Sequence, residues 1–126
     1  MKVLGIDYGK KRIGLAVSDE SFTLARELDI LAPKEFWKQI NHLIKNHQIT
    51  KIILGWPLNM SGGKTEKTEE VKMFKEKLEK VTGLKVEVID ERLTSQMAEN
   101  LPGGKSQTDS LAAQIILQNY LNKPKN

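Results

Sequence analysis

The stretch V-L-G-I-D-Y-G-K-K-R-I-G-L-A-V-S, residues 3–18, contains two apolar runs around a short polar loop with glycine. This pattern predicts a β-hairpin. Asp7 stands near the end of the first run, although Asp is depleted in strands and an ionised carboxylate beside a core is costly unless a cation compensates it. We therefore expect a cationic group or a metal ion to meet Asp7. An Asx-type turn residue ahead of Gly9 is the alternative.

The composition of the chain limits its class. With 126 residues, 39% of them hydrophobic and 29% charged, we expect residues 1–126 to form one globular domain. No apolar run approaches the roughly 20 residues of a membrane span, so no membrane partner is expected. The absence of Cys excludes disulfides and thiolate metal sites and suits a cytoplasmic protein. A net charge of +4 weakly favours a polyanionic partner such as nucleic acid.

The periodicity of the remaining chain predicts an α/β fold. A third strand is expected between Phe22 and Ile30, and Pro33 opens a helix whose apolar stripe begins at Phe36. The later predicted elements are strands over 51–55 and 85–89, helices over 65–81 and 108–121, and a short helix near 94–101. The main order, β-β-β-α-β-α-β-α, predicts a mixed sheet. We expect an antiparallel meander, then parallel strands returned by crossover helices, with the first strand central.

Acidic residues stand at element ends that this topology brings to one edge of the sheet. Asp7 ends the first strand, Asp90 and Glu91 end the last strand, and Asp109 begins the final helix. Several hard oxygen ligands without Cys suit Mg²⁺ or Mn²⁺. Asp90 and Glu91 point to opposite sides of an extended strand, so we expect at most one of them to be a ligand. An acidic turn paired with Arg92 is the alternative reading of these two residues.

Asp109 is expected to face the sheet. Ala112, Ala113 and Ile116 follow it by three, four and seven positions and therefore share its side of the helix. Small alanine side chains let the helix approach the sheet closely, as a carboxylate that meets Asp7 across a metal requires. An Asp at this position also suits a helix cap, and the residues alone leave both roles open.

Four stretches resemble the signature motifs of a known family. They are G-I-D-Y-G-K-K-R-I-G-L-A-V-S-D (5–19), G-W-P-L-N-M-S-G (55–62), D-E-R-L-T-S (90–95) and D-S-L-A-A-Q-I-I-L-Q-N-Y-L (109–121). Together they resemble the YqgF family, whose members are described as pre-16S rRNA nucleases or as Holliday-junction-resolvase-like proteins. The resemblance implies a ribonuclease H-like three-layer fold with a mixed five-stranded sheet and a metal-dependent nuclease centre.

The resemblance also implies a set of site residues. The family's catalytic and metal-binding carboxylates fall on Asp7, Glu91 and Asp109, which would hold two Mg²⁺ or Mn²⁺ ions for phosphodiester hydrolysis. Nucleic-acid contacts are expected from five basic residues in or near the motifs: Lys10, Lys11, Arg12, Arg92 and Lys105. Two features depart from the family pattern. The loop over 101–108 is short and has Lys105 as its one basic residue, and Trp56 stands where an aliphatic residue is common.

The function implied by the resemblance is processing of the 5′ end of pre-16S rRNA, with a ribosomal precursor as the partner. A Holliday junction resolvase acting on branched DNA is an alternative, and a symmetric junction would require a homodimer rather than a monomer. A non-catalytic nucleic-acid or ribosome-binding module is a third reading. The hairpin is also similar to the phosphate loop of actin-like kinases, although the chain has length for one of their two lobes. The sequence contains no identifiable side chain that would read a base or a 2′-hydroxyl, so it does not show whether structured RNA or DNA is the substrate.

Overall fold

The computed structural model describes residues 1–56, 66–90 and 108–122. Within these ranges the elements are β1 (Lys2–Asp7), β2 (Ile13–Ser18), β3 (Ala25–Leu31), α1 (Pro33–His47), β4 (Ile49–Trp56), α2 (Glu66–Thr82), β5 (Val86–Asp90) and α4 (Thr108–Asn122). The predicted main order of elements is confirmed. The short helix predicted near 94–101 lies outside the described residues.

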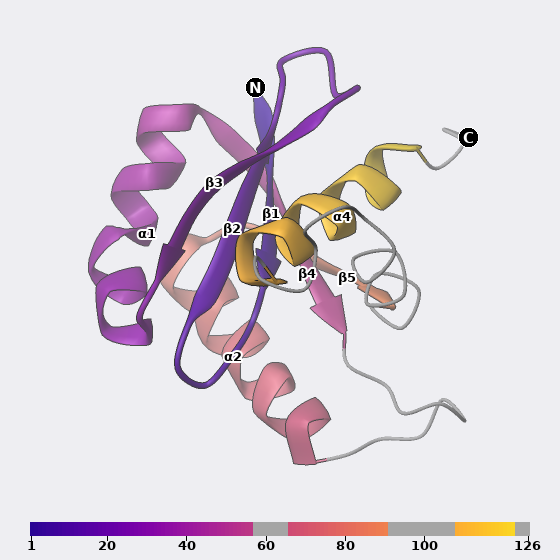
Figure 1. Cartoon of the computed structure of the whole chain (residues 1–126). Coiled ribbons are helices and arrows are strands. Elements are labelled where there is room, and N and C mark those ends of the chain that lie inside the picture. Colours follow the sequence, from indigo (N-terminus) through magenta and orange to yellow (C-terminus); the bar gives the residue numbers. More distant parts are fainter. Residues whose placement is uncertain (57–65, 91–107, 123–126) are drawn as a thin grey trace.

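The five strands form one mixed sheet in the order β3-β2-β1-β4-β5 (Figure 1). β1 is central, as predicted, and it pairs antiparallel with β2 and parallel with β4. β4 pairs parallel with β5. Because β1, β4 and β5 run in the same direction, their carboxyl ends lie at one edge of the sheet.

Helices cover both faces of the sheet, which gives three layers (Figure 1). Alternate residues of β1 separate two hydrophobic cores. Leu4 and Ile6 belong to a larger core with side chains of α1 and α2, among them Phe36 and Leu78. On the opposite face, Val3 belongs to a smaller core that α4 covers with Ala113, Ile116 and Leu117. No helix of the described segments is long and apolar enough to cross a membrane.

The third strand begins later than predicted, at Ala25 rather than Phe22. The carboxylate of Asp19 accepts hydrogen bonds from the backbone N–H groups of Thr23 and Leu24, at 2.8 and 3.2 Å, and from the hydroxyl of Thr23. Phe22 takes a left-handed backbone conformation, with φ of 59°. These contacts close a turn over residues 19–24, so the β-rich composition from Phe22 onward does not start a strand.

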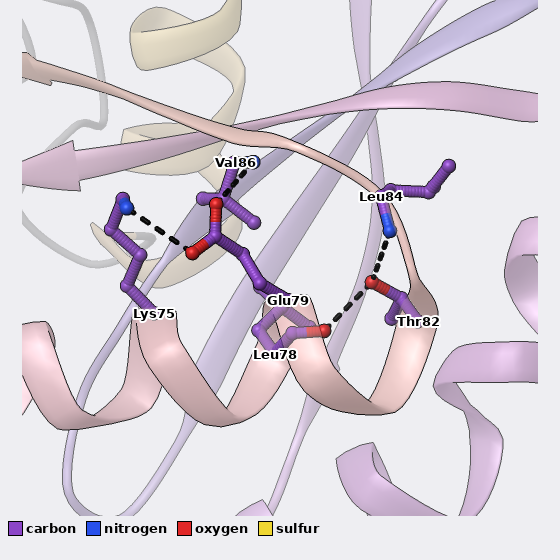
Figure 2. A network of polar contacts seen from close by, with 6 residues as sticks. All are labelled: Lys75, Leu78, Glu79, Thr82, Leu84 and Val86. Atoms are coloured by element: carbon purple, nitrogen blue, oxygen red, sulfur yellow. Dashed lines mark hydrogen bonds and ion pairs between the residues drawn. The ribbon is translucent and has the colours of Figure 1, made fainter.

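A polar network sets where β5 begins (Figure 2). Glu79 accepts a hydrogen bond from the backbone N–H of Val86 at 3.2 Å and pairs with Lys75 at 3.3 Å. The hydroxyl of Thr82 donates to the carbonyl of Leu78 at 2.7 Å and accepts from the N–H of Leu84 at 3.2 Å. The backbone bond to Val86 is the main reason that the pKa of Glu79 lies below its usual value. The end of α2 is thereby tied to the start of β5.

Candidate active site

Asp7 is the last residue of β1 and is half-buried at the carboxyl edge of the sheet. It stands opposite Gly14 of β2 in the antiparallel register. Val3 and Gly5 face α4, and successive side chains of a strand alternate between faces. The carboxylate of Asp7 is therefore on the face that α4 covers.

α4 approaches β1 very closely at Gly5. A Cβ atom at Gly5 would lie 2.7 Å from the Cβ of Leu117 and 3.1 Å from the carbonyl oxygen of Ala113. Farther along the helix, the hydroxyl of Tyr120 bonds to Lys51, which stands beside Val3 in the β1–β4 register. Towards its C-terminal end, α4 thus runs toward the start of β1.

The first turn of α4 consequently lies toward the Asp7 end of β1 (Figure 1). Asp109 precedes Ala113 by four residues, or about 6 Å along the helix axis. Asp7 follows Gly5 by two residues, or about 6.6 Å along the strand. The backbone of Asp109 therefore lies toward the edge of the sheet at which β1 ends.

The other predicted carboxylates are described only in part. Asp90 is the last residue of β5 and stands beside Trp56 of β4, at the same edge of the sheet as Asp7. The backbone of Asp109 lies in the first turn of α4, but its side chain is outside what the structure describes, as are Glu91, Arg92 and Lys105. Among the described side chains, no group of three acidic, His or Cys residues is arranged to hold a metal. That the three carboxylates meet remains a prediction.

The hairpin loop after Asp7 presents basic residues to solvent. Lys10, Lys11 and Arg12 are all exposed. Lys10 forms an ion pair with Glu70 of α2 at 3.0 Å, while 75% of its side chain stays accessible. Gly9 is required by the tightness of the loop, because a Cβ there would lie 2.6 Å from the carbonyl oxygen of Arg12. The predicted basic rim therefore borders the Asp7 edge of the sheet, with Lys10 partly neutralised.

Trp56 ends β4 and is half-buried against the larger core, on the side of Ile52 and Leu54. This face is opposite to the one that carries Asp7. Its position favours a packing role over a stacking surface for a base.

Polar contacts that sequence reasoning missed hold α4 on the sheet. Gln118 accepts a hydrogen bond from the backbone N–H of Ala25 at 2.8 Å, and Gln114 donates to the carbonyl of Ala25 at 3.1 Å. On the other flank, the ammonium of Lys51 lies 2.6 Å from the Tyr120 hydroxyl and 2.7 Å from the Glu87 carboxylate. The hydrogen bond to Glu87, followed by that to Tyr120, raises the pKa of Lys51. Nothing in the local sequence pattern of these residues reveals their partners.

The order of the strands and the helices on both faces of the sheet define a protein with a ribonuclease H-like fold. The fold is similar to that of Thermus thermophilus RuvC in complex with a Holliday junction substrate. The TM-score is 0.64 at 15% identity, over 94% of this chain and 90% of that chain.

Relatives with clear sequence similarity identify the family of this chain among proteins of the ribonuclease H-like fold. A model of the RuvX family, described as a Holliday junction resolvase, matches residues 1–123. The chain is 40% identical to a protein of Caldanaerobacter subterraneus over 138 residues, which covers 100% of this chain and 99% of the relative. It is 38% identical to a protein of Dictyoglomus thermophilum over 132 residues, covering 96% and 95%. Both relatives are named "Putative pre-16S rRNA nuclease". The chain belongs to the RuvX family, also called YqgF, and is an enzyme of the nuclease class.

Proposed function

We propose that this chain is a cytoplasmic, metal-dependent endonuclease that processes the 5′ end of pre-16S rRNA, with residues 1–126 as one nuclease domain. The observation that carries the proposal is the position of Asp7. Its half-buried carboxylate ends the central strand on the face that α4 covers, and the backbone of Asp109 belongs to the first turn of α4. The RNA substrate in this proposal is inferred from the names of the two relatives, which are 38% and 40% identical to this chain.

The donor set fits hard divalent cations. The chain has no Cys, and the residues proposed as ligands, Asp7, Glu91 and Asp109, all offer carboxylate oxygens, which Mg²⁺ and Mn²⁺ prefer. Asp7 is half-buried, and a cation attracts a partly desolvated carboxylate more strongly than a fully solvated one. When bound, two such ions supply Lewis-acid stabilisation and a water of lowered pKa at a scissile phosphate.

The basic residues would act on the nucleic-acid backbone. Lys11 and Arg12 are exposed at the loop that follows Asp7, beside Lys10. Their cations neutralise phosphates and orient a scissile bond toward the carboxylates, and Arg92 and Lys105 are proposed to extend the same surface. Binding should then weaken steeply with salt, because each neutralised phosphate releases a counterion. A flat salt response would contradict this role.

Resolution of four-way DNA junctions is the second candidate function. Two observations favour it: the matching family model is described as a Holliday junction resolvase, and the fold is that of a junction-bound RuvC. Symmetric cleavage of a junction needs two active sites, so this function requires a homodimer, whereas RNA trimming suits a monomer.

One assay separates the candidates. The purified chain is incubated in Mg²⁺ or Mn²⁺ with a structured RNA that spans the 5′ end of 16S rRNA and, separately, with a four-way DNA junction. Cleavage of the RNA at a defined site, with the junction intact, supports the first proposal. Paired nicks in the junction support the second. Binding of either substrate without any cleavage would identify a non-catalytic binding module and contradict both.

A further inference from the structure

The contact between α4 and β1 leaves no space at Gly5. A methyl group there would overlap the Cβ of Leu117 at 2.7 Å, where ordinary contact begins at 3.4 Å, and would press on the carbonyl oxygen of Ala113 at 3.1 Å. Leu117 and Ala113 are fully buried. Neither contacting atom is the end of a flexible side chain, so the helix itself would have to move, by about 0.7 Å at the Leu117 contact.

The C-terminal half of α4 is anchored on both flanks. Gln118 bonds to the backbone of Ala25 on one side at 2.8 Å, and Tyr120 bonds to Lys51 on the other at 2.6 Å. These two anchors lie on the C-terminal side of the Gly5 contact, and Gln114, which bonds to the carbonyl of Ala25 at 3.1 Å, lies within that contact. A group inserted at Gly5 would push against α4 at Ala113, four residues after Asp109, and so would move the first turn of the helix away from β1.

We propose that Gly5 is a positioning residue for the nuclease centre: by allowing α4 to rest directly on β1, it sets the distance between the Asp7 carboxylate and the helix turn that carries Asp109. The inference rests on the proposed function, since it assigns Gly5 a role in the same metal site. Two-metal sites hold their ions about 3.5–4 Å apart. Misplacement of a reacting group by about 1 Å can cost about 10²-fold in rate.

The test is Mn²⁺ binding to the metal-free protein, followed by electron paramagnetic resonance of the free ion. Three proteins are compared at a temperature where circular dichroism shows each to be folded: the native chain, Gly5→Ala and Leu78→Ala. Leu78 is fully buried in the larger core on the opposite face, so its truncation lowers stability without touching the α4 contact. We expect Gly5→Ala to bind Mn²⁺ at least about tenfold more weakly, and Leu78→Ala to bind it like the native chain.

Steady-state cleavage supplies a second readout. Gly5→Ala should lower kcat by about 10²-fold with KM nearly unchanged, because the nucleic-acid surface of the hairpin loop is intact. If Gly5→Ala does not fold, Ala113→Ser takes its place. It adds a single heavy atom to a fully buried side chain in the smaller core between α4 and the sheet, and should weaken Mn²⁺ binding about threefold.

Equal Mn²⁺ affinity of the native chain and Gly5→Ala, or of the native chain and Ala113→Ser where that variant is used, would overturn the positioning role and leave the proposed function standing. An equal loss in Leu78→Ala would also overturn it, since general destabilisation would then explain the effect. Failure of the native chain to bind Mn²⁺ would overturn both the positioning role and the proposed metal-dependent activity.

Discussion

Replacing Gln118 with methionine should remove one of the two glutamine attachments of α4 to Ala25 of β3, the other being Gln114, while keeping the side-chain volume. The lost bonds are those to the N–H of Ala25 and the carbonyl of Thr23, each at 2.8 Å, and to Asn122 at 3.1 Å. Ala25 is 7% exposed, so its N–H is left buried without its acceptor, which costs about 1–3 kcal/mol. Thr23 is exposed, and water replaces the bond to its carbonyl. We expect the free energy of unfolding to fall by about 2 kcal/mol.

Urea denaturation followed by circular dichroism measures this loss. With a slope of about 2 kcal/mol per M, the unfolding midpoint of Gln118→Met should fall by about 1 M at an unchanged slope. Asn122→Ala is the matched control, because it deletes only the exposed bond between the two side chains. It should change the free energy of unfolding by less than about 0.5 kcal/mol. A loss in Gln118→Met no larger than in the control would refute the argument that a buried N–H depends on this side chain.

Three further changes test other contacts. Glu70→Gln removes an ion-pair partner of Lys10 and one negative charge beside the hairpin loop, and we expect RNA affinity in a filter-binding assay to rise about two- to fivefold at low salt and not at high salt. Asp19→Asn should destabilise the chain at pH 7 but not below about pH 2. The hydrogen bond from the backbone N–H of Thr23 is the main cause that lowers the pKa of Asp19 to about 2. The ionised carboxylate therefore stabilises the fold above its unfolded pKa, and this stabilisation is lost as the pH falls through about 2. Urea midpoints of the native chain and of Asp19→Asn across this pH range test the effect. Leu117→Ala should lower the free energy of unfolding by about 3–5 kcal/mol, measured in urea, because the side chain is fully buried.

The arrangement of the sheet was predictable from the sequence because it depends on local periodicity and on chain connectivity. The apolar run that ends at Asp7 predicts a strand, and the crossover rule places parallel strands after the hairpin. The run Ile52–Gly55 is buried, as its uniform apolar composition predicts. Pro33 starts α1, as its fixed φ predicts.

The errors arise where a side chain acts on distant or irregular backbone. The predicted start of the third strand at Phe22 is wrong because the carboxylate of Asp19 binds the following backbone N–H groups in a turn. Gln118 and Lys51 find partners 93 and 69 residues away in the chain, which no local pattern encodes. The need for glycine at position 5 follows from the position of α4 and cannot be seen in a strand sequence.

For the site, the sequence places Asp7 at a strand end, and the structure adds that it is half-buried on the side of α4. Residue type and spacing predict that Asp109 is brought to the same edge, and the backbone of α4 agrees with this. The contribution of Glu91 rests on its position directly after β5 and on the family resemblance, and it stays a prediction.

Single-turnover cleavage of the structured RNA in Mn²⁺ by the native chain and by Asp7→Asn tests the central claim most directly. Asparagine keeps the size of the side chain and removes its charge, so circular dichroism and the melting temperature in the absence of metal should show an intact fold. Loss of several kcal/mol of charge stabilisation predicts a rate at least about 10³-fold lower. Cleavage by Asp7→Asn at the native rate would contradict the assignment of Asp7 as a metal-binding catalytic residue.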